Sequence, residues 1–159
     1  VRRLNSEEKA IIKQKNDRAI YIYKHAQELK LGYKYTLQIN DKIDYNGLKE
    51  INSFSVLEEN GRFKNYRSLF INAKKNDILN SSNQNEIAFN LKGKVKKRKL
   101  YINDSKSILN GKSIKIFAKN KQDLPKSNQT VTFKTAHIGV YRGVPQILIH
   151  SSSDYKVGN

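Results

Sequence analysis

The chain has 159 residues, which is the length of one ordinary domain or of two very small ones. It is 37% hydrophobic with a net charge of +17, and no apolar run is long enough to form a transmembrane helix. The lack of cysteine excludes disulfides and thiolate metal sites. The first residues contain neither an initiating Met nor an apolar signal-peptide core, which predicts a mature or excised fragment.

The positive charge is distributed unevenly along the chain. Residues 1–60 contain 11 Lys or Arg and 9 Asp or Glu, a balance of +2, whereas residues 61–159 contain 20 and 5, a balance of +15. A lysine-rich, well-solvated surface would account for a high pI by itself. The asymmetry within one chain favours a localised anionic partner instead.

Residues 1–59 are predicted to form an incomplete β unit. Asn46-Gly47 is a strong signal for a two-residue hairpin turn, because both positions tolerate a positive φ.

A connecting segment at 60–84 follows. Its apolar patch, Tyr66 to Ile71, predicts either a short helix or an extra strand that could fill the gap in the first unit. The polar tail NSSNQ (80–84) is typical of a linker.

Residues 85–159 are predicted to form a complete unit of strands. Residues 85–104 are expected to be one long strand or a bent pair with its bend at Gly93, because glycine permits a bulge. Residues 113–119 alternate strictly, which predicts one inward and one outward row. The inward row is Ile114, Ile116 and Ala118, and the outward row is Lys115, Phe117 and Lys119.

The last two strands of this unit are expected to form a hairpin. Residues 129–141 predict a long strand with Val131 and Phe133 inward and an interruption at Gly139. Arg142-Gly143 then turns the chain into the final strand, and Pro145 belongs near the start of that strand because it lacks an N–H.

One seven-residue pattern occurs twice, as YNGLKEI (45–51) and YRGVPQI (141–147). The segments before them also align, 19–37 over 113–133, with an insertion of two residues between the copies. This agreement over several elements predicts one structural unit used twice, in which the repeated phrase marks the hairpin corner.

This order of strands, ending in Y-x-G-[LV]-x-[EQ]-I, resembles the OB-fold, a five-stranded Greek-key β-barrel. It is most similar to the OB-fold modules attached to secreted bacterial nucleases, whose last hairpin carries a similar Y-x-G-x-P-Q-I phrase. YRGVPQI follows that pattern, and YNGLKEI departs from it at the Pro. The resemblance implies an all-β chain, with an OB-fold domain at 85–159, a partial copy at 1–59 and a secreted or cell-envelope location. In the partial copy it implies that KAIIKQKND (9–17) takes the place of the second strand, and that the first strand is missing or reduced to residues 1–8.

The resemblance also implies where a ligand lies. OB-folds bind oligonucleotides or oligosaccharides mainly on the open face of strands two and three. Aromatic rings there stack on bases while cations neutralise phosphates. The dense basic run 92–99 predicts a basic finger with its tip between Lys96 and Lys99. The predicted nucleic-acid-binding residues are Lys94, Lys96, Lys97, Arg98, Lys99, Tyr101, Lys115, Phe117, Lys119 and Arg142.

Structural interpretations of the same residues stay open. The basic run is equally consistent with a solvated hairpin, and Phe117 with packing between strands or units. Tyr21 and Tyr23 occupy the matching places in the first unit. They form a predicted secondary aromatic face, which either stacks on bases or covers the neighbouring unit.

No catalytic site, metal site or cofactor is predicted. His25, His137 and His150 lack metal-ligand spacing, although the last two could face each other across the final hairpin in a structural role. The predicted function is non-catalytic binding of single-stranded nucleic acid with little sequence specificity. Two alternatives stay open: a protein-interaction module whose first unit docks a partner, and an accessory domain or fragment of a nuclease.

Overall fold

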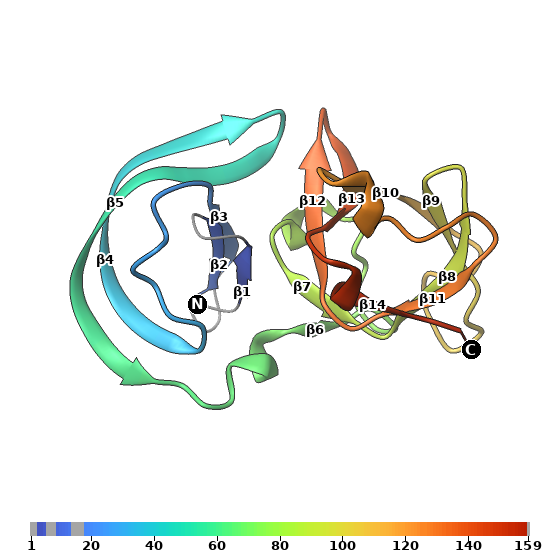
Figure 1. Ribbon diagram of the computed structural model, residues 1–159, viewed down its shortest axis with the longest axis horizontal. Helices are drawn as coiled ribbons and strands as arrows, with labels where there is room; N and C mark the ends of the chain where they lie inside the picture. The colour runs from blue at the N-terminus through green and yellow to red at the C-terminus, as the bar shows by residue number, and fades with distance from the viewer. Residues whose placement is uncertain (1–2, 6–8, 14–17, 159) are drawn as a thin grey trace.

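The computed structural model describes residues 3–5, 9–13 and 18–158. The described chain is all-β apart from four short 3-10 helices, and its strands form two sheets that lie side by side (Figure 1). The first sheet contains the N-terminal strands, and the second contains the C-terminal strands. The fold class predicted from the sequence is therefore confirmed at the level of all-β.

The first sheet has five strands in the order β1-β2-β3-β5-β4. β3 and β5 are parallel and every other neighbouring pair is antiparallel. The long β4–β5 hairpin curls around the first unit (Figure 1). The strands are β1 (Arg3–Asn5), β2 (Lys9–Lys13), β3 (Ala19–Ile22), β4 (Tyr33–Tyr45) and β5 (Leu48–Arg62).

The second sheet has nine strands in the order β14-β11-β8-β9-β10-β13-β12-β7-β6. Two of its neighbouring pairs are parallel, β10 with β13 and β6 with β7. The strands are β6 (Ile71–Asn72), β7 (Ile87–Phe89), β8 (Leu91–Lys96), β9 (Lys99–Ile102), β10 (Ser113–Ala118), β11 (Thr130–Phe133), β12 (Ala136–Tyr141), β13 (Val144–Ile149) and β14 (Tyr155–Val157).

The two sheets share a pattern of strand pairing. β3 pairs in parallel with β5 in the first sheet, and β10 pairs in parallel with β13 in the second: Tyr21 lies opposite Glu50, and Lys115 lies opposite Gln146. The alignment of residues 19–37 with 113–133 and of the two seven-residue phrases pairs these same positions. The neighbouring pairs are antiparallel in both sheets. These are β2 with β3 and β4 with β5 in the first sheet, and β9 with β10 and β12 with β13 in the second.

Both repeated phrases form hairpin corners, as the sequence predicts. Asn46 and Arg142 each have a φ of 51°, and each is followed by a glycine with positive φ. The two corners also touch, because the N–H of Arg142 donates to the carbonyl of Asn46 at 2.7 Å. In the first corner, the Asp44 carboxylate accepts from Lys49 Nζ and from the N–H of Gly47, and these bonds lower the pKa of Asp44.

The connecting segment does not fill the gap in the first unit. Residues 66–69 form a 3-10 helix (η1, Tyr66–Leu69), and β6 follows it directly. β6 pairs with β7 and so belongs to the second sheet. The sequence left a short helix and an extra strand open for the apolar patch from Tyr66 to Ile71, and the patch contains η1 and the first residue of β6.

The bend in the first long strand of the second unit lies at Asn90, so the prediction of Gly93 is wrong. Asn90 has a φ of 60° and separates β7 from β8, whereas Gly93 lies within β8. A Cβ at Gly93 would collide with the carbonyl of Tyr101 on the neighbouring strand. Glycine at this position therefore allows β8 and β9 to approach each other closely.

The predicted interruption at Gly139 is also wrong, because Gly139 lies inside β12. The strand is interrupted instead at Lys134 and Thr135, between β11 and β12. The backbone N–H groups of Lys134 and Thr135 both donate to the carbonyl of Asp154. A Cβ at Gly139 would lie 2.7 Å from the Leu148 side chain. Glycine here makes room for that leucine.

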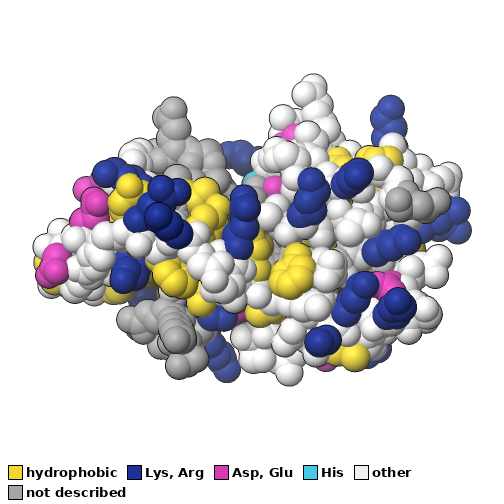
Figure 2. All heavy atoms as spheres, turned by 90° about the horizontal axis from the view of Figure 1, so that it is seen from below, with side chains coloured by type: hydrophobic (Ala, Val, Ile, Leu, Met, Phe, Trp, Pro, Cys, Tyr) yellow, Lys and Arg dark blue, Asp and Glu magenta, His cyan; other side chains and the backbone are white. Residues whose placement is uncertain are grey.

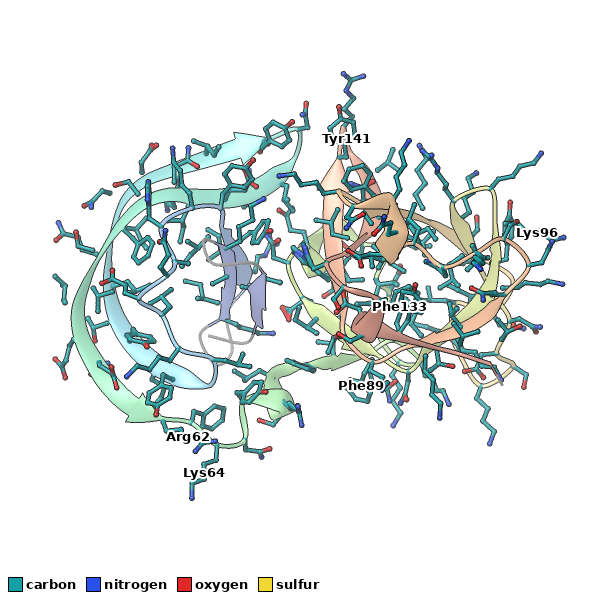
Figure 3. All side chains as sticks on the ribbon, in the orientation of Figure 1. Arg62, Lys64, Phe89, Lys96, Phe133 and Tyr141 are labelled. Carbon is teal, nitrogen blue, oxygen red and sulfur yellow. The ribbon has the colours of Figure 1, made fainter. Side chains whose placement is uncertain are left out.

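The larger core lies inside the second unit. Val131 and Phe133 are fully buried there, as predicted, and Figure 3 shows Phe133 in its interior. The first unit has a smaller core around Ile22, Leu29 and Ile51. A third cluster joins the units: Ile11, Tyr21 and Leu48 from the first sheet pack with Ile87, Leu148 and Phe70.

Polar contacts reinforce the junction between the units. Lys13 Nζ lies 2.8 Å from the Glu86 carboxylate, and both side chains are largely buried. Glu50 is also on this buried side of the first sheet, 4% exposed. Burial raises the pKa of Glu50, and the nearby positive charge of Lys9 offsets only part of that effect.

Candidate nucleic-acid interface

The outward side of β8, β9 and β10 brings most of the predicted binding residues together. β10 alternates as predicted, with Ile114, Ile116 and Ala118 buried and Lys115 and Phe117 exposed. β8 and β9 alternate in the same way, which puts Lys94, Lys96, Lys99 and Tyr101 on the surface. We call the surface formed by Lys94, Lys96, Lys99, Tyr101, Lys115 and Phe117 the β8–β10 face.

Three lysines lie side by side across the β8–β10 face. Lys96 is opposite Lys99, and Lys99 is in turn opposite Lys115. Like charges directly opposite each other in a sheet destabilise it. An anion placed over this row would relieve the repulsion.

Aromatic rings flank the lysine row on both sides. Tyr101 is two residues from Lys99 along β9, and Phe117 is two residues from Lys115 along β10 in the opposite direction. The rings are 43% and 52% exposed, respectively. Strand geometry separates the two ring positions by about 14 Å, with the lysine row between them. The order across the face is therefore aromatic, cationic, aromatic.

The tip of the β8–β9 hairpin lies at Lys97 and Arg98, where the sequence predicts a basic finger. Both residues have positive φ, 48° and 60°, and both are exposed. Figure 3 shows the adjacent Lys96 pointing outward at the far end of the second unit. The tip extends the β8–β10 face with two further cations.

No carboxylate occupies an outward position of β8, β9 or β10. Basic side chains also occur elsewhere, since Figure 2 shows Lys and Arg spread over the side of the molecule seen from below. The β8–β10 face is therefore distinguished by its opposed lysines, exposed rings and lack of acids, and not by positive charge alone.

Two predicted residues lie outside both the β8–β10 face and the hairpin tip. Lys119 follows β10 directly and is exposed. Arg142 is at the tip of the β12–β13 hairpin, beside Asn46, and its guanidinium lies over the Tyr141 ring at 5.3 Å. Arg142 therefore belongs to the contact between the two corners and not to the β8–β10 face.

The predicted secondary aromatic face is wrong for Tyr21. Tyr21 is only 4% exposed, and its ring packs edge-on against His137 with centroids 4.9 Å apart. Tyr23 is 45% exposed, with Lys9 Nζ 4.6 Å from its ring centroid. Of the two uses that the sequence left open for Tyr21, covering the neighbouring unit is the one observed.

His137 and His150 face each other across the last hairpin, within the junction of the units. His137 Nδ1 and His150 Nε2 are 2.8 Å apart, and His137 Nε2 is 2.8 Å from Asn85 Oδ1. Asn85 Nδ2 donates to the carbonyl of Lys49 in the first unit. Asn85 Oδ1 is therefore the acceptor, and His137 donates through Nε2–H. This buried network links the units.

Two neighbours of the β8–β10 face were not among the predicted residues. Lys92 is half-buried on the outward side of β8, and Gln146 lies opposite Lys115 on β13. The alternation of β8 could have identified Lys92. Gln146 lies beside Lys115 only because β10 pairs with β13, and that pairing could not be predicted from the sequence.

Among the described residues, no group of three or more His, Cys, Asp or Glu side chains could hold a metal ion. No helix in the described part of the chain is long and apolar enough to span a membrane. No protein-family model matches the sequence, and neither a curated protein nor a solved structure is detectably similar to it.

Proposed function

We propose that the protein binds single-stranded nucleic acid without catalysis, on the β8–β10 face of an OB-like second unit. The observation that carries this proposal is the row of opposed lysines between the exposed rings of Tyr101 and Phe117. Phosphates would neutralise the lysines, and bases would stack on the rings. Contacts to phosphates and to ring faces give little sequence preference.

The strand pairing supports the OB-like interpretation. β7 and β8 are separated only by Asn90, and they pair with β12 at one end and with β9 at the other. Between these ends the order is β9, β10, β13 and β12, with β10 and β13 parallel. This order of pairings supports a five-stranded Greek-key barrel, in which β9 and β10 would be strands two and three. The first unit would be an incomplete copy.

Fluorescence anisotropy with a labelled oligodeoxythymidylate tests the binding proposal. We assume four phosphate contacts, one each for Lys94, Lys96, Lys99 and Lys115. They predict that the logarithm of the binding constant falls with the logarithm of the salt concentration with a slope of about −3. The double variant Lys99→Glu and Lys115→Glu should weaken binding at least ten-fold. The matched control is Lys126→Glu with Lys134→Glu, which makes the same charge change at two exposed loop positions of the second unit.

Two results would overturn the proposal. One is the absence of binding to single-stranded DNA or RNA at low salt. The other is an equal loss of affinity in the control double variant, because binding would then depend on net charge and not on the β8–β10 face. A duplex of the same sequence serves as the comparison and is expected to bind more weakly, since its bases are not available for stacking.

A further inference from the structure

The outer edge of β4 differs from that of its counterpart in the second unit. β4 is the last strand of the first sheet, and no described strand pairs with its outer edge. The equivalent strand, β12, is covered on that side by β7. A long strand edge with unpaired N–H and C=O groups is a template for pairing with another chain.

The contact of β7 with β12 shows which kind of strand would fit against the outer edge of β4. Ile138 donates its N–H to the carbonyl of Glu86 at 3.0 Å and accepts from the N–H of Asn85 at 2.6 Å. Ile138 lies opposite Ile147, as Lys42 lies opposite Ile51 in the first sheet. Lys42 therefore occupies the place of Ile138. A strand added to β4 in the same way would put its own residue equivalent to Glu86 beside Lys42.

A groove of about 1030 Å³ runs along the inner side of β4. Its apolar lining includes Ile12, Ile20, Leu37, Ile39 and Ile51. Lys34 and Lys42 also line it, and neither forms an ion pair with any described residue. The groove thus combines apolar surface with two available positive charges.

We propose that the β4 edge and this groove accept an extended strand from a protein partner, as β7 covers β12. Main-chain hydrogen bonds to β4 provide affinity, and side chains pointing into the groove provide selectivity. The guest strand carries a carboxylate opposite Lys42, on the side of the strand that faces the groove. The site lies on the first unit, so its existence does not depend on the nucleic-acid proposal.

The protein's own β7 sequence supplies a probe. A fluorescein-labelled peptide NEIAFNL, the sequence of residues 85–91, is titrated with the full chain and followed by anisotropy. We expect saturable binding, together with slower amide hydrogen exchange in residues 40–44. A scrambled peptide of the same composition should not bind.

Variants at Lys42 test the main-chain hydrogen bond and the charge pair separately. Lys42→Pro removes the N–H equivalent to that of Ile138, and proline is tolerated on a strand edge where this N–H is not used within the sheet. It should weaken binding at least ten-fold. Lys42→Glu should weaken binding about two- to five-fold, and the peptide NKIAFNL should bind this variant better than it binds the unaltered protein. Lys106→Glu, exposed in the second unit, is the control.

Three outcomes would overturn the proposal. The first is no anisotropy change with millimolar protein. The second is protection by the peptide that maps away from β4. The third is concentration-dependent protection of β4 without peptide, accompanied by a dimer in sedimentation, because a second copy of this chain would then occupy the edge. Oligonucleotide binding measured on the same samples separates this result from the proposed function of the β8–β10 face.

Discussion

Replacing Phe117 provides the sharpest test of the β8–β10 face. Its ring is 52% exposed in the free protein, so only about half of its burial energy contributes to folding. Phe117→Ala should therefore cost about 1 kcal/mol of unfolding free energy. If the ring stacks on a base, the same change removes about 1–3 kcal/mol of binding free energy, which corresponds to roughly 5- to 150-fold in affinity.

Two further substitutions separate stacking from general apolar contact. Phe117→Tyr keeps an aromatic face and should retain affinity within about two-fold, whereas Phe117→Leu keeps much of the apolar volume and should bind nearly as weakly as the alanine variant. Anisotropy with a labelled oligodeoxythymidylate measures all three, and urea unfolding confirms that each is folded. Ile108→Ala, at an exposed hydrophobic residue outside the face, is the control. Full affinity in Phe117→Leu would refute the stacking argument.

Three predictions concern stability, each measured by urea unfolding. Gly93→Ala should lose about 3 kcal/mol because its Cβ meets the Tyr101 carbonyl; a loss below about 1 kcal/mol would contradict this close contact. Tyr21→Ala should also lose about 3 kcal/mol, because the ring fills the junction of the units, and near-neutral behaviour would show that the junction contributes little. Burial raises the pKa of Glu50, so its charged form opposes folding: Glu50→Gln should be the more stable protein at pH 7, with an advantage that shrinks as the pH falls through the raised pKa. A less stable Glu50→Gln at pH 7 would contradict that sign.

Local features of the fold could be predicted from the sequence. The two sides of β10 follow from strict alternation, because side chains of a strand point to opposite faces at every residue. The corner at Asn46-Gly47 follows from the φ angles that these residues tolerate. Each of these predictions depends only on neighbours in the chain.

Features set by distant contacts could not be predicted in the same way. Gly93 and Gly139 suggest bends when considered locally, but each is required by an atom on the next strand. Tyr21 and Lys115 occupy matching places in the aligned segments, yet Tyr21 is buried and Lys115 is exposed. The difference arises because the first sheet packs against the second unit, and no local pattern encodes that contact.

The hairpin corners impose a restriction on how the chain can vary. The Arg142 N–H bonds to the Asn46 carbonyl, and the space at Gly47 is bounded by the Val140 side chain. A residue inserted into one corner would displace the other, although the two turns come from opposite halves of the sequence. Changes in the length of either turn are therefore tolerated only when the opposing turn changes with it.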